Sequence, residues 1–382
     1  MKKYLKSDIS KVVLIALIWI LVVNLFSYWG SKIFKMEGIS ANRRFATVDH
    51  WFWYDSGFYL GIASNGYKTL HDPEVWGQNY VRAAFFPMYP LTGRLFYDAL
   101  KFTNIDVRQS MLFVNYLFVI GISIFLYKLA YEYKKDKEYS YKTLIYFLVF
   151  PFSFFLLAPY SEASLVFFTV GAIYFMSKGN YLWAGLMGIG ATASRFIGII
   201  FPLIIFLHYL ESNDWKIKSI NIRIILYCII PTLGLLGYMV YQKIYLGDYM
   251  YFYKMQKLWR SDFEINVFKT VWINYKEIFH RDFFNYRRIN EIGSIIAFSV
   301  LGLISIKKTN IAFAVFIFLS LLVPLLTGRV DSINRFVVTI VPAFLIIGLI
   351  YKNRLLEWAY ILICILFLAM FTLMFTHSMW VA

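Results

Sequence analysis

A single carboxylate stands among aromatic side chains in the stretch WFWYDSGFYLGIASNGY, which runs from Trp51 to Tyr67. That acid is Asp55, and partial desolvation on an aromatic rim suits a carboxylate for the role of general base. A competing interpretation, which the sequence alone favours, is that Asp55 only caps a short helix over residues 56–64. Asp49 is an alternative base, because a helix that begins near Trp51 would bring both acids toward one site.

Arg195 is the second candidate for a functional-site residue. It lies within the apolar run 181–210, where a guanidinium must reach water, a carboxylate or a phosphate. A possible carboxylate partner is Glu162, which follows Tyr160 in the stretch PFSFFLLAPYSEASL, residues 151–165. The simpler interpretation of Glu162 is an acid in the first turn of a helix. The alternative is a side chain that binds a sugar hydroxyl or an arginine.

Two further arginines occur in stretches that suit the edge of a membrane. Arg82 opens the stretch RAAFFPMYPL, residues 82–91, which is either an interfacial aromatic belt or a groove for a lipid chain with Arg82 or Arg94 beside the headgroup. Arg335 belongs to the stretch TGRVDSINRF, residues 327–336. There, snorkelling and mutual pairing among Arg329, Asp331 and Arg335 form the simpler interpretation, and contact with a phosphate is the alternative.

Several chemistries lack their usual motifs. The chain carries no P-loop, no Rossmann glycine signature, no HExxH and no Cys/His cluster, which argues against nucleotide-driven pumping and zinc chemistry. Its two cysteines, Cys228 and Cys364, lie far apart in apolar runs and suggest neither a metal cluster nor a disulfide framework. We therefore expect no metal and no cofactor.

The elements that position these residues are predicted to be membrane-spanning helices. Hydrophobic residues make up 60% of the 382 residues and charged residues only 16%, with a mean hydropathy of +0.60. Apolar runs long enough to cross a bilayer recur along the chain, which predicts an all-α polytopic integral membrane protein without a separate soluble domain. The net charge of +16 then reflects topology determinants and contacts with membrane lipids, and we expect no nucleic acid partner.

Basic residues indicate the topology. Lysines within residues 2–11 precede the first apolar run, which places the N-terminus in the cytoplasm and Asp55 outside. A second basic cluster, at residues 134–142, returns the chain to the inside. The run 181–210 begins inside, yet the loop that follows it is basic too, so one crossing cannot satisfy both assignments. We therefore expect two short halves hinged around GATASRFIG, with Arg195 at a helix break near the outer side.

About eleven crossings result, with the C-terminus outside. Two long loops, residues 35–109 and 247–290, remain outside, and we expect the chemistry there. The second loop is basic, which suits an anionic headgroup or phosphate. The expected spans are Val12–Phe34, Ser110–Tyr133, Thr143–Tyr160, Glu162–Met176, the two halves of 181–210, Ile224–Leu246, Glu291–Ile306, Asn310–Leu326, Phe336–Tyr351 and Leu355–Thr376.

Several motifs, taken in order, resemble the mannosyltransferase family typified by GPI mannosyltransferase II (PIG-V). The first outer loop contributes WYDSGFYLGIASNGY and, after a short gap, QNYVRAAFFPMYPL. The motifs that follow are PFSFFLLAPYSEASL, ATASRFIG, YLGDYMYFYKMQKLWR and NRFVVTIVPAFL. Each motif alone is weak, but their order along most of the chain is fairly specific.

The resemblance implies a GT-C glycosyltransferase fold, with residues 1–382 as a single membrane domain and helices in the large first outer loop. It also implies transfer of a sugar, usually mannose in this family, from a polyprenyl-phosphate donor to an acceptor hydroxyl with inversion. Asp55 would be the general base, and Arg195 with Arg260 or Arg335 would hold the leaving phosphate. The expected substrate-binding residues are Arg195, Glu162, Tyr160, Arg260, Gln256, Arg335 and Arg82.

The sequence leaves the acceptor open, as a glycolipid, a cell-wall polymer or a protein. The basic N-terminus and lysine-rich loops suggest a multi-pass protein of a bacterial plasma membrane with an extracytoplasmic active site. A transporter or flippase of a lipid-linked saccharide is the second functional class, in which Glu162 and Arg195 would line a substrate or proton path. The sequence shows no internal repeat, which disfavours this second class.

Overall fold

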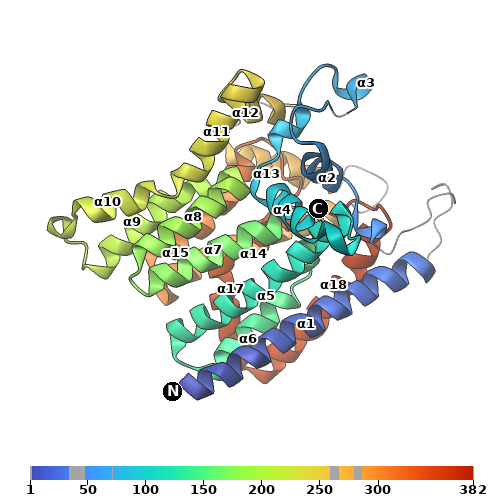
Figure 1. Ribbon diagram of the computed structural model, residues 1–382. Helices are drawn as coiled ribbons and strands as arrows, with labels where there is room; N and C mark the ends of the chain where they lie inside the picture. Colours follow the sequence, from blue (N-terminus) through green and yellow to red (C-terminus); the bar gives the residue numbers. More distant parts are fainter. Residues whose placement is uncertain (1, 34–47, 71, 259–265, 279–285, 382) are drawn as a thin grey trace.

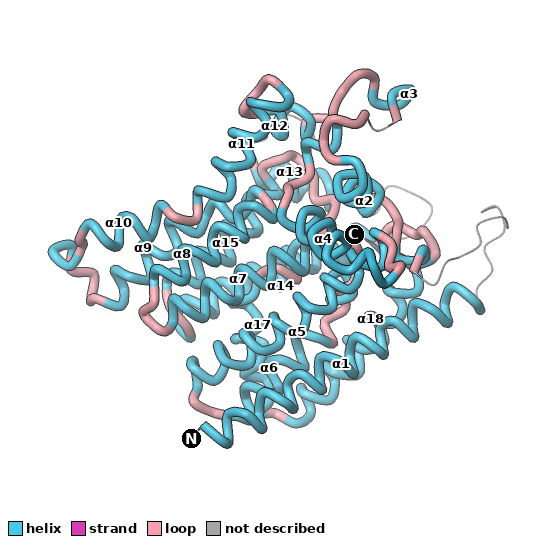
Figure 2. The backbone as a smooth tube through the Cα atoms, viewed as in Figure 1, coloured by secondary structure: helices cyan, strands magenta, loops and turns pink. Residues whose placement is uncertain are grey.

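The computed structural model describes residues 2–33, 48–70, 72–258, 266–278 and 286–381. Helices and their connecting loops make up this part of the chain, and no strand occurs within it (Figure 2). The all-α class predicted from the sequence is therefore confirmed for the described residues. Their long apolar helices indicate a membrane-embedded protein.

The segment between the first two long helices is itself helical. It follows α1 (Lys2–Ile33) and precedes α5 (Val107–Lys134). Helices are thus present in the described part of residues 35–109, as predicted. These elements are η1 (Asp49–Trp51), α2 (Ser56–Asn65), α3 (Pro73–Trp76), η2 (Val81–Ala84), α4 (Met88–Leu100) and η3 (Lys101–Thr103).

The remaining helices pack with α1 and α5 into the bundle of Figure 1. They are α6 (Lys137–Leu148), η4 (Ser153–Leu156), α7 (Glu162–Ser177), α8 (Tyr181–Ser194), η5 (Phe196–Ile200), α9 (Phe201–Ser212), η6 (Ile217–Ser219), α10 (Ile222–Ile229), α11 (Thr232–Leu246), α12 (Tyr251–Gln256), α13 (Val267–Lys276), α14 (Tyr286–Lys308), α15 (Ile311–Leu325), α16 (Ile333–Val337), α17 (Val341–Ile347), η7 (Gly348–Lys352) and α18 (Arg354–Thr376).

Fewer helices than expected are long enough to cross a bilayer alone. Within the described residues, stretches of α1, α5, α14 and α18 have the required length and apolar composition. The pair α10 and α11, bent by 47°, makes a fifth span if it is counted as one. Shorter apolar helices coincide with four of the other predicted runs, as Glu162–Ser177, Phe196–Ser212, Ile311–Leu325 and Val341–Lys352. The count of about eleven crossings therefore stays a prediction.

Prolines explain two of the differences from the expected spans. The run 143–160 is not one helix, because α6 ends at Leu148 and Pro151 follows before the short η4. The run 336–351 is also divided, since α16 ends at Val337 and α17 begins with Pro342 in its first turn. Proline lacks a backbone N–H and fixes its φ angle, which interrupts a helix that hydropathy alone would continue.

Basic turns gather at one end of the bundle. Lys137 at the start of α6 lies 2.7 Å from Asp8 of α1, and Lys178 after α7 lies 2.7 Å from Glu132 of α5. In Figure 1 the N-terminus marks this end, whereas α2, α4 and the C-terminus lie at the opposite end. The loop before α2 reaches α18 there, because the Trp53 indole N–H donates to the carbonyl oxygen of Thr376 at 3.2 Å.

Aromatic packing fixes this opposite end. The ring of Tyr160 lies 5.8 Å from Phe155 and 5.9 Å from Phe375 of α18, measured between centroids. Trp51 is 1% exposed and lies 6.2 Å from the same Phe375 ring. Tyr160 also donates its hydroxyl to the carbonyl oxygen of Trp53 at 3.1 Å. The turn that carries Asp55 is therefore attached to the bundle by buried rings and hydrogen bonds.

Candidate functional site

Asp55 lies immediately before α2, but its side chain does not cap that helix. Its backbone is already helical, with φ −58° and ψ −23°, whereas a capping residue is usually extended. The first amides of the turn find backbone acceptors, since Ser56 N–H donates to Trp53 and Gly57 N–H to Tyr54. The capping interpretation is therefore wrong. The Asp55 carboxylate instead accepts a hydrogen bond of 2.6 Å from Nη1 of Arg335.

Arg195 occupies the break between two short helices, as predicted. It has an extended backbone, φ −159° and ψ 153°, between the end of α8 and the start of η5. Gly198 makes this fold possible, because a Cβ atom there would lie 2.5 Å from the backbone of Ala191 in α8. Tyr181 at the start of α8 contacts His208 near the end of α9, 3.2 Å apart. The two halves therefore return to one end of the bundle and leave Arg195 at their tip.

Glu162 joins the two arginines. Nη1 of Arg195 donates to Oε1 of Glu162 at 2.5 Å, which confirms the predicted pairing. Nε of Arg335 lies 3.2 Å from the same oxygen. The predicted pairing of Arg335 with Asp331 is wrong, because Asp331 accepts a hydrogen bond from Arg288 instead.

We call Asp55, Arg335, Glu162 and Arg195 the four-charge cluster. Its charges alternate in sign, and the residues come from four separate segments of the chain. The side chains of Glu162 and Arg335 are 1% and 8% exposed, whereas those of Arg195 and Asp55 are 21% and 28% exposed. The buried pair of Glu162 and Arg335 thus connects two partly exposed groups, the anionic Asp55 and the cationic Arg195.

Aromatic rings hold the guanidinium groups in place. The centroid of Phe336 lies 4.3 Å from Cζ of Arg195 and 5.2 Å from Cζ of Arg335. The buried ring of Tyr160 lies 5.2 Å from Cζ of Arg335. Each cation–π contact of this kind contributes about 0.5–2 kcal/mol. Burial lowers the pKa of Arg335, but the carboxylates of Asp55 and Glu162 outweigh it and raise the pKa above its ordinary value.

Three of the predicted site residues, Asp49, Gln256 and Arg82, make their contacts outside the four-charge cluster. Tyr160 is not a member of it either, but its ring packs against Arg335. Asp49 accepts a hydrogen bond of 2.9 Å from Arg108, and Gln256 donates to the carbonyl oxygen of Ala84 at 3.4 Å. Arg260 lies outside the described residues.

Arg82 has a structural contact. Its side chain is buried, and Nη1 lies 3.3 Å from the carbonyl oxygen of Gly61 and 3.4 Å from that of Gly66. A Cβ atom at Gly61 would lie 2.6 Å from the guanidinium, so a larger residue there would require the Arg82 side chain to move. Arg82 therefore fastens the end of α2, the helix that begins beside Asp55.

Two aromatic residues of the site were missed in the sequence. Phe336 follows Arg335 directly, and this adjacency is the signal that could have revealed it. Tyr59 is buried in α2 and donates its hydroxyl to Oγ of Ser161 at 2.8 Å. That bond connects the helix of Asp55 to the residue before Glu162.

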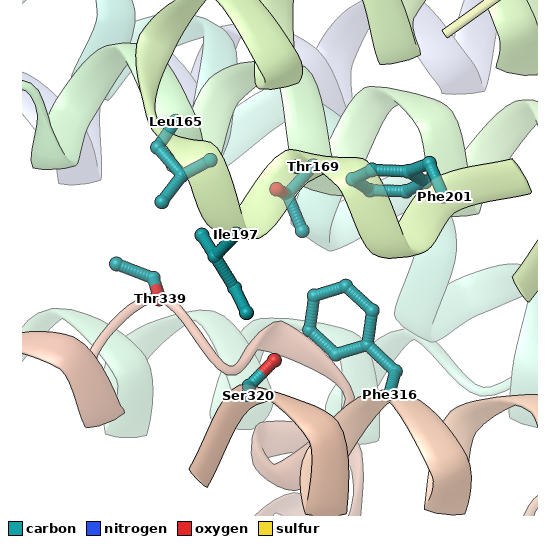
Figure 3. Close-up of a pocket in the computed structure, with 8 residues that line it drawn as sticks. Leu165, Thr169, Ile197, Phe201, Phe316, Ser320 and Thr339 are labelled. Atoms are coloured by element: carbon teal, nitrogen blue, oxygen red, sulfur yellow. The ribbon is translucent and has the colours of Figure 1, made fainter. Parts of the chain in front are cut away.

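A small cavity is lined by residues that lie close in sequence to three members of the cluster (Figure 3). It is lined by residues a few positions beyond the charged ones, including Leu165, Ile197 and Thr339, with Thr169, Phe316 and Ser320. The volume open to the centre of a water molecule is about 10 Å³, which is enough for about one water molecule. This cavity therefore cannot hold a sugar or a lipid chain in the conformation described.

The site has few options for binding a metal ion. In the described part of the chain, no three His, Cys, Asp or Glu side chains group closely enough to hold one. Each carboxylate of the four-charge cluster already faces a guanidinium. Metal independence stays a prediction.

Part of the chain is similar to a known family of proteins. A family model described as Mannosyltransferase (PIG-V) matches residues 31–200. The matched part contains Asp55, Glu162 and Arg195, and it ends before Arg335. A search of curated proteins found no match. The match covers less than half of the chain, and it shows that this part is similar to PIG-V mannosyltransferases, which are glycosyltransferases.

Proposed function

We propose that this protein is a PIG-V-like mannosyltransferase. It would move a sugar from a polyprenyl-phosphate donor to an acceptor hydroxyl on the extracytoplasmic side of the membrane, and the likeness to the family indicates that the sugar is mannose. The observation that carries the proposal is the contact between Asp55 and Arg335, which places a partly exposed carboxylate beside a guanidinium. A base for the acceptor and a cation for the leaving phosphate are the two groups that this reaction requires.

In the proposed reaction, the oxygen of the acceptor hydroxyl attacks the anomeric carbon and Asp55 takes the hydroxyl proton. The bond between the anomeric carbon and the phosphate oxygen breaks as the new glycosidic bond forms, and the centre inverts. The polyprenyl phosphate departs with the bonding electron pair. Arg195 and Arg335 offset the charge that develops on it, which is usually the largest single contribution to catalysis.

The four-charge cluster also suggests how the donor prepares the base. Two guanidinium groups face two carboxylates, so their charges cancel when all four groups are ionised. A donor phosphate would compete with Asp55 for Arg335, because both ligands are anionic oxygens that suit the guanidinium fork. Donor binding would thus release Asp55 to accept the proton of the second substrate.

The remaining predicted residues keep proposed roles around this centre. Arg260 is proposed to bind the donor phosphate, and the resemblance of its stretch to the family carries that role. Arg82, Gln256 and Tyr160 are proposed to shape the substrate site. Arg82 and Tyr160 bind the backbone on either side of Asp55, which supports a role in shaping that part of the site. The acceptor stays open, as a glycolipid, a polymer or a protein.

A transporter or flippase of a lipid-linked saccharide is the second candidate. One observation favours it, since α8 and η5 form a broken helix with a charged residue at the break, as occurs in transporters. The family match favours the transferase, so this function ranks below the first.

The decisive experiment measures transfer of radiolabelled mannose from polyprenyl-phosphate-mannose to acceptors in membranes with equal amounts of wild type, Asp55→Asn or Asp49→Asn. We expect Asp55→Asn to reduce transfer by roughly 10²–10⁴-fold, because it removes a general base. Asp49→Asn is the matched control and should retain wild-type transfer, since Asp49 pairs with Arg108. Equal transfer by Asp55→Asn would refute its role as base, and no transfer by wild type would call for a flipping assay.

A further inference from the structure

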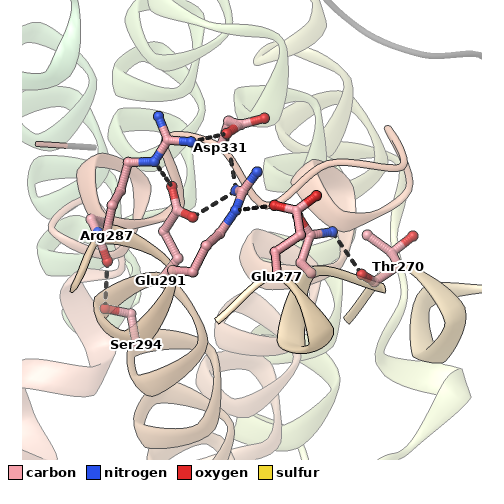
Figure 4. A network of polar contacts seen from close by, with 9 residues as sticks. Thr270, Glu277, Arg287, Glu291, Ser294 and Asp331 are labelled. Carbon is pink, nitrogen blue, oxygen red and sulfur yellow. Dashed lines mark hydrogen bonds and ion pairs between the residues drawn. The ribbon is translucent and has the colours of Figure 1, made fainter. Parts of the chain in front are cut away.

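A second network of charged side chains surrounds the first turns of α14 (Figure 4). Arg288 donates from Nε to Oε2 of Glu277 at 2.7 Å, and from Nη1 to Oε2 of Glu291 at 2.8 Å. Its Nη1 also donates to Oδ1 of Asp331 at 3.0 Å. Arg287 lies 3.3 Å from the same Asp331 oxygen. We call these residues the α14 network.

The α14 network is attached to the segment that carries Arg335. Asp331 lies four positions before Arg335, in the turn that leads into α16. One turn further along α14, Oγ of Ser294 donates to Oδ1 of Asn334 at 2.9 Å. Asn334 is fully buried and precedes Arg335 directly. Two separate bonds from α14 thus hold the chain on the N-terminal side of Arg335.

The helix that carries Arg335 cannot fix its own position. α16 has only five residues, and a helix this short is unstable unless other parts of the protein hold it. Its N-cap residue Ser332 is left-handed, with φ 71°, and makes no capping hydrogen bond through its side chain. The orientation of α16 therefore comes from packing, from the ion pairs of Arg335 itself and from the bonds of Asp331 and Asn334.

We propose that the α14 network and Ser294 are positioning residues for Arg335, and so for its contacts with Asp55 and Glu162. This inference rests on the proposed function, in which Arg335 binds the donor phosphate and offsets its charge. Glu291 is fully buried and Arg288 is 7% exposed. Removing one member would leave its partner as an uncompensated charge and shift the turn. Ser294 offers a milder change, because its bond to Asn334 carries no formal charge.

The first test compares Ser294→Ala with Ser294→Thr, which keeps the hydroxyl. For Ser294→Ala we expect kcat/KM for polyprenyl-phosphate-mannose to fall about tenfold, roughly the effect of one lost hydrogen bond. The KM for the acceptor should stay unchanged, and Ser294→Thr should restore most of the loss. Ser305→Ala is the control, because Ser305 is also buried in α14 and bonds Thr309 instead.

A second comparison tests the charged bond. Asp331→Asn should raise the KM for the donor, whereas Asp214→Asn should not, since the Asp214 ion pair with Lys216 is exposed and near the basic end. Thermal stabilisation of the purified protein by polyprenyl phosphate measures the same site without turnover, and both Ser294→Ala and Asp331→Asn should weaken it. If both variants keep wild-type donor kinetics and wild-type stabilisation by polyprenyl phosphate, the positioning role is refuted and the proposed function is not. If wild type neither transfers mannose nor is stabilised, the proposed function fails and this inference fails with it.

Discussion

At the scale of the residue, two acids of one loop differ in what faces them. Asp49 meets Arg108, whose side chain is 46% exposed, so water screens the pair. Asp55 meets Arg335, whose side chain is 8% exposed and also lies within ion-pair distance of Glu162. The buried guanidinium is held by its surroundings before a substrate arrives. Such preorganisation is what stabilises a developing charge without further rearrangement.

Arg335→Lys tests whether the shape of the guanidinium matters beyond its charge. Arg335 faces Asp55 through Nη1 and Glu162 through Nε, and one ammonium cannot reproduce this fork. We expect kcat/KM for the donor to fall roughly tenfold to hundredfold. Initial rates at varied donor concentration measure the change.

Arg108→Lys is the matched control for that substitution, since its partner is also an aspartate in the same loop. It should keep donor kinetics within about twofold of wild type, because exposed ion pairs contribute little. A normal kcat/KM in Arg335→Lys would show that a positive charge alone suffices.

At the scale of the element, the turn after α8 depends on one glycine. A Cβ atom at Gly198 would lie 2.5 Å from backbone atoms of both Ala191 and Thr192, and backbone cannot move aside as a flexible side chain can. Gly198→Ala should therefore displace η5 and Arg195 and reduce transfer at least about tenfold. The transfer assay with equal protein levels measures this.

Gly237→Ala in α11 is the control, because nothing lies within 4 Å of a Cβ atom there. It should retain activity and leave stability unchanged or raise it, since alanine favours a helix by about 1 kcal/mol over glycine. Equal activity in the two alanine variants would mean that η5 tolerates displacement.

The sequence predicted the elements whose cause is local. The break at Arg195 was predicted because the turns before and after residues 181–210 are both basic, and a single crossing would place them on opposite sides of the membrane. The helix after Asp55 was predicted from the composition of its own residues. The contact between Asp55 and Arg335 joins residues 280 positions apart, and no local pattern encodes it. The capping prediction failed for the same reason, because the partner that holds the Asp55 carboxylate comes from distant α16.

At the scale of the whole molecule, the basic turns and the four-charge cluster lie at opposite ends of the bundle. Lys137, Lys178 and Lys216 mark turns at the end that holds the N-terminus, while the four-charge cluster lies at the end that holds α2. Anionic lipid and the positive-inside rule favour a cytoplasmic position for the first end. The proposed reaction would then use a donor whose sugar faces the opposite side of the membrane.

Labelling of single cysteines tests this orientation. In a background of Cys228→Ala and Cys364→Ala, Lys216→Cys reports the basic end and Phe102→Cys reports the turn between α4 and α5. Both positions are exposed, with the Lys216 side chain at 70% and Phe102 at 79%, so each thiol should react once the reagent reaches it. A membrane-impermeant maleimide should label Phe102→Cys in intact cells and Lys216→Cys only after permeabilisation. The reverse pattern would place Asp55 in the cytoplasm, where a nucleotide-sugar donor is chemically available, and would contradict the extracytoplasmic reaction.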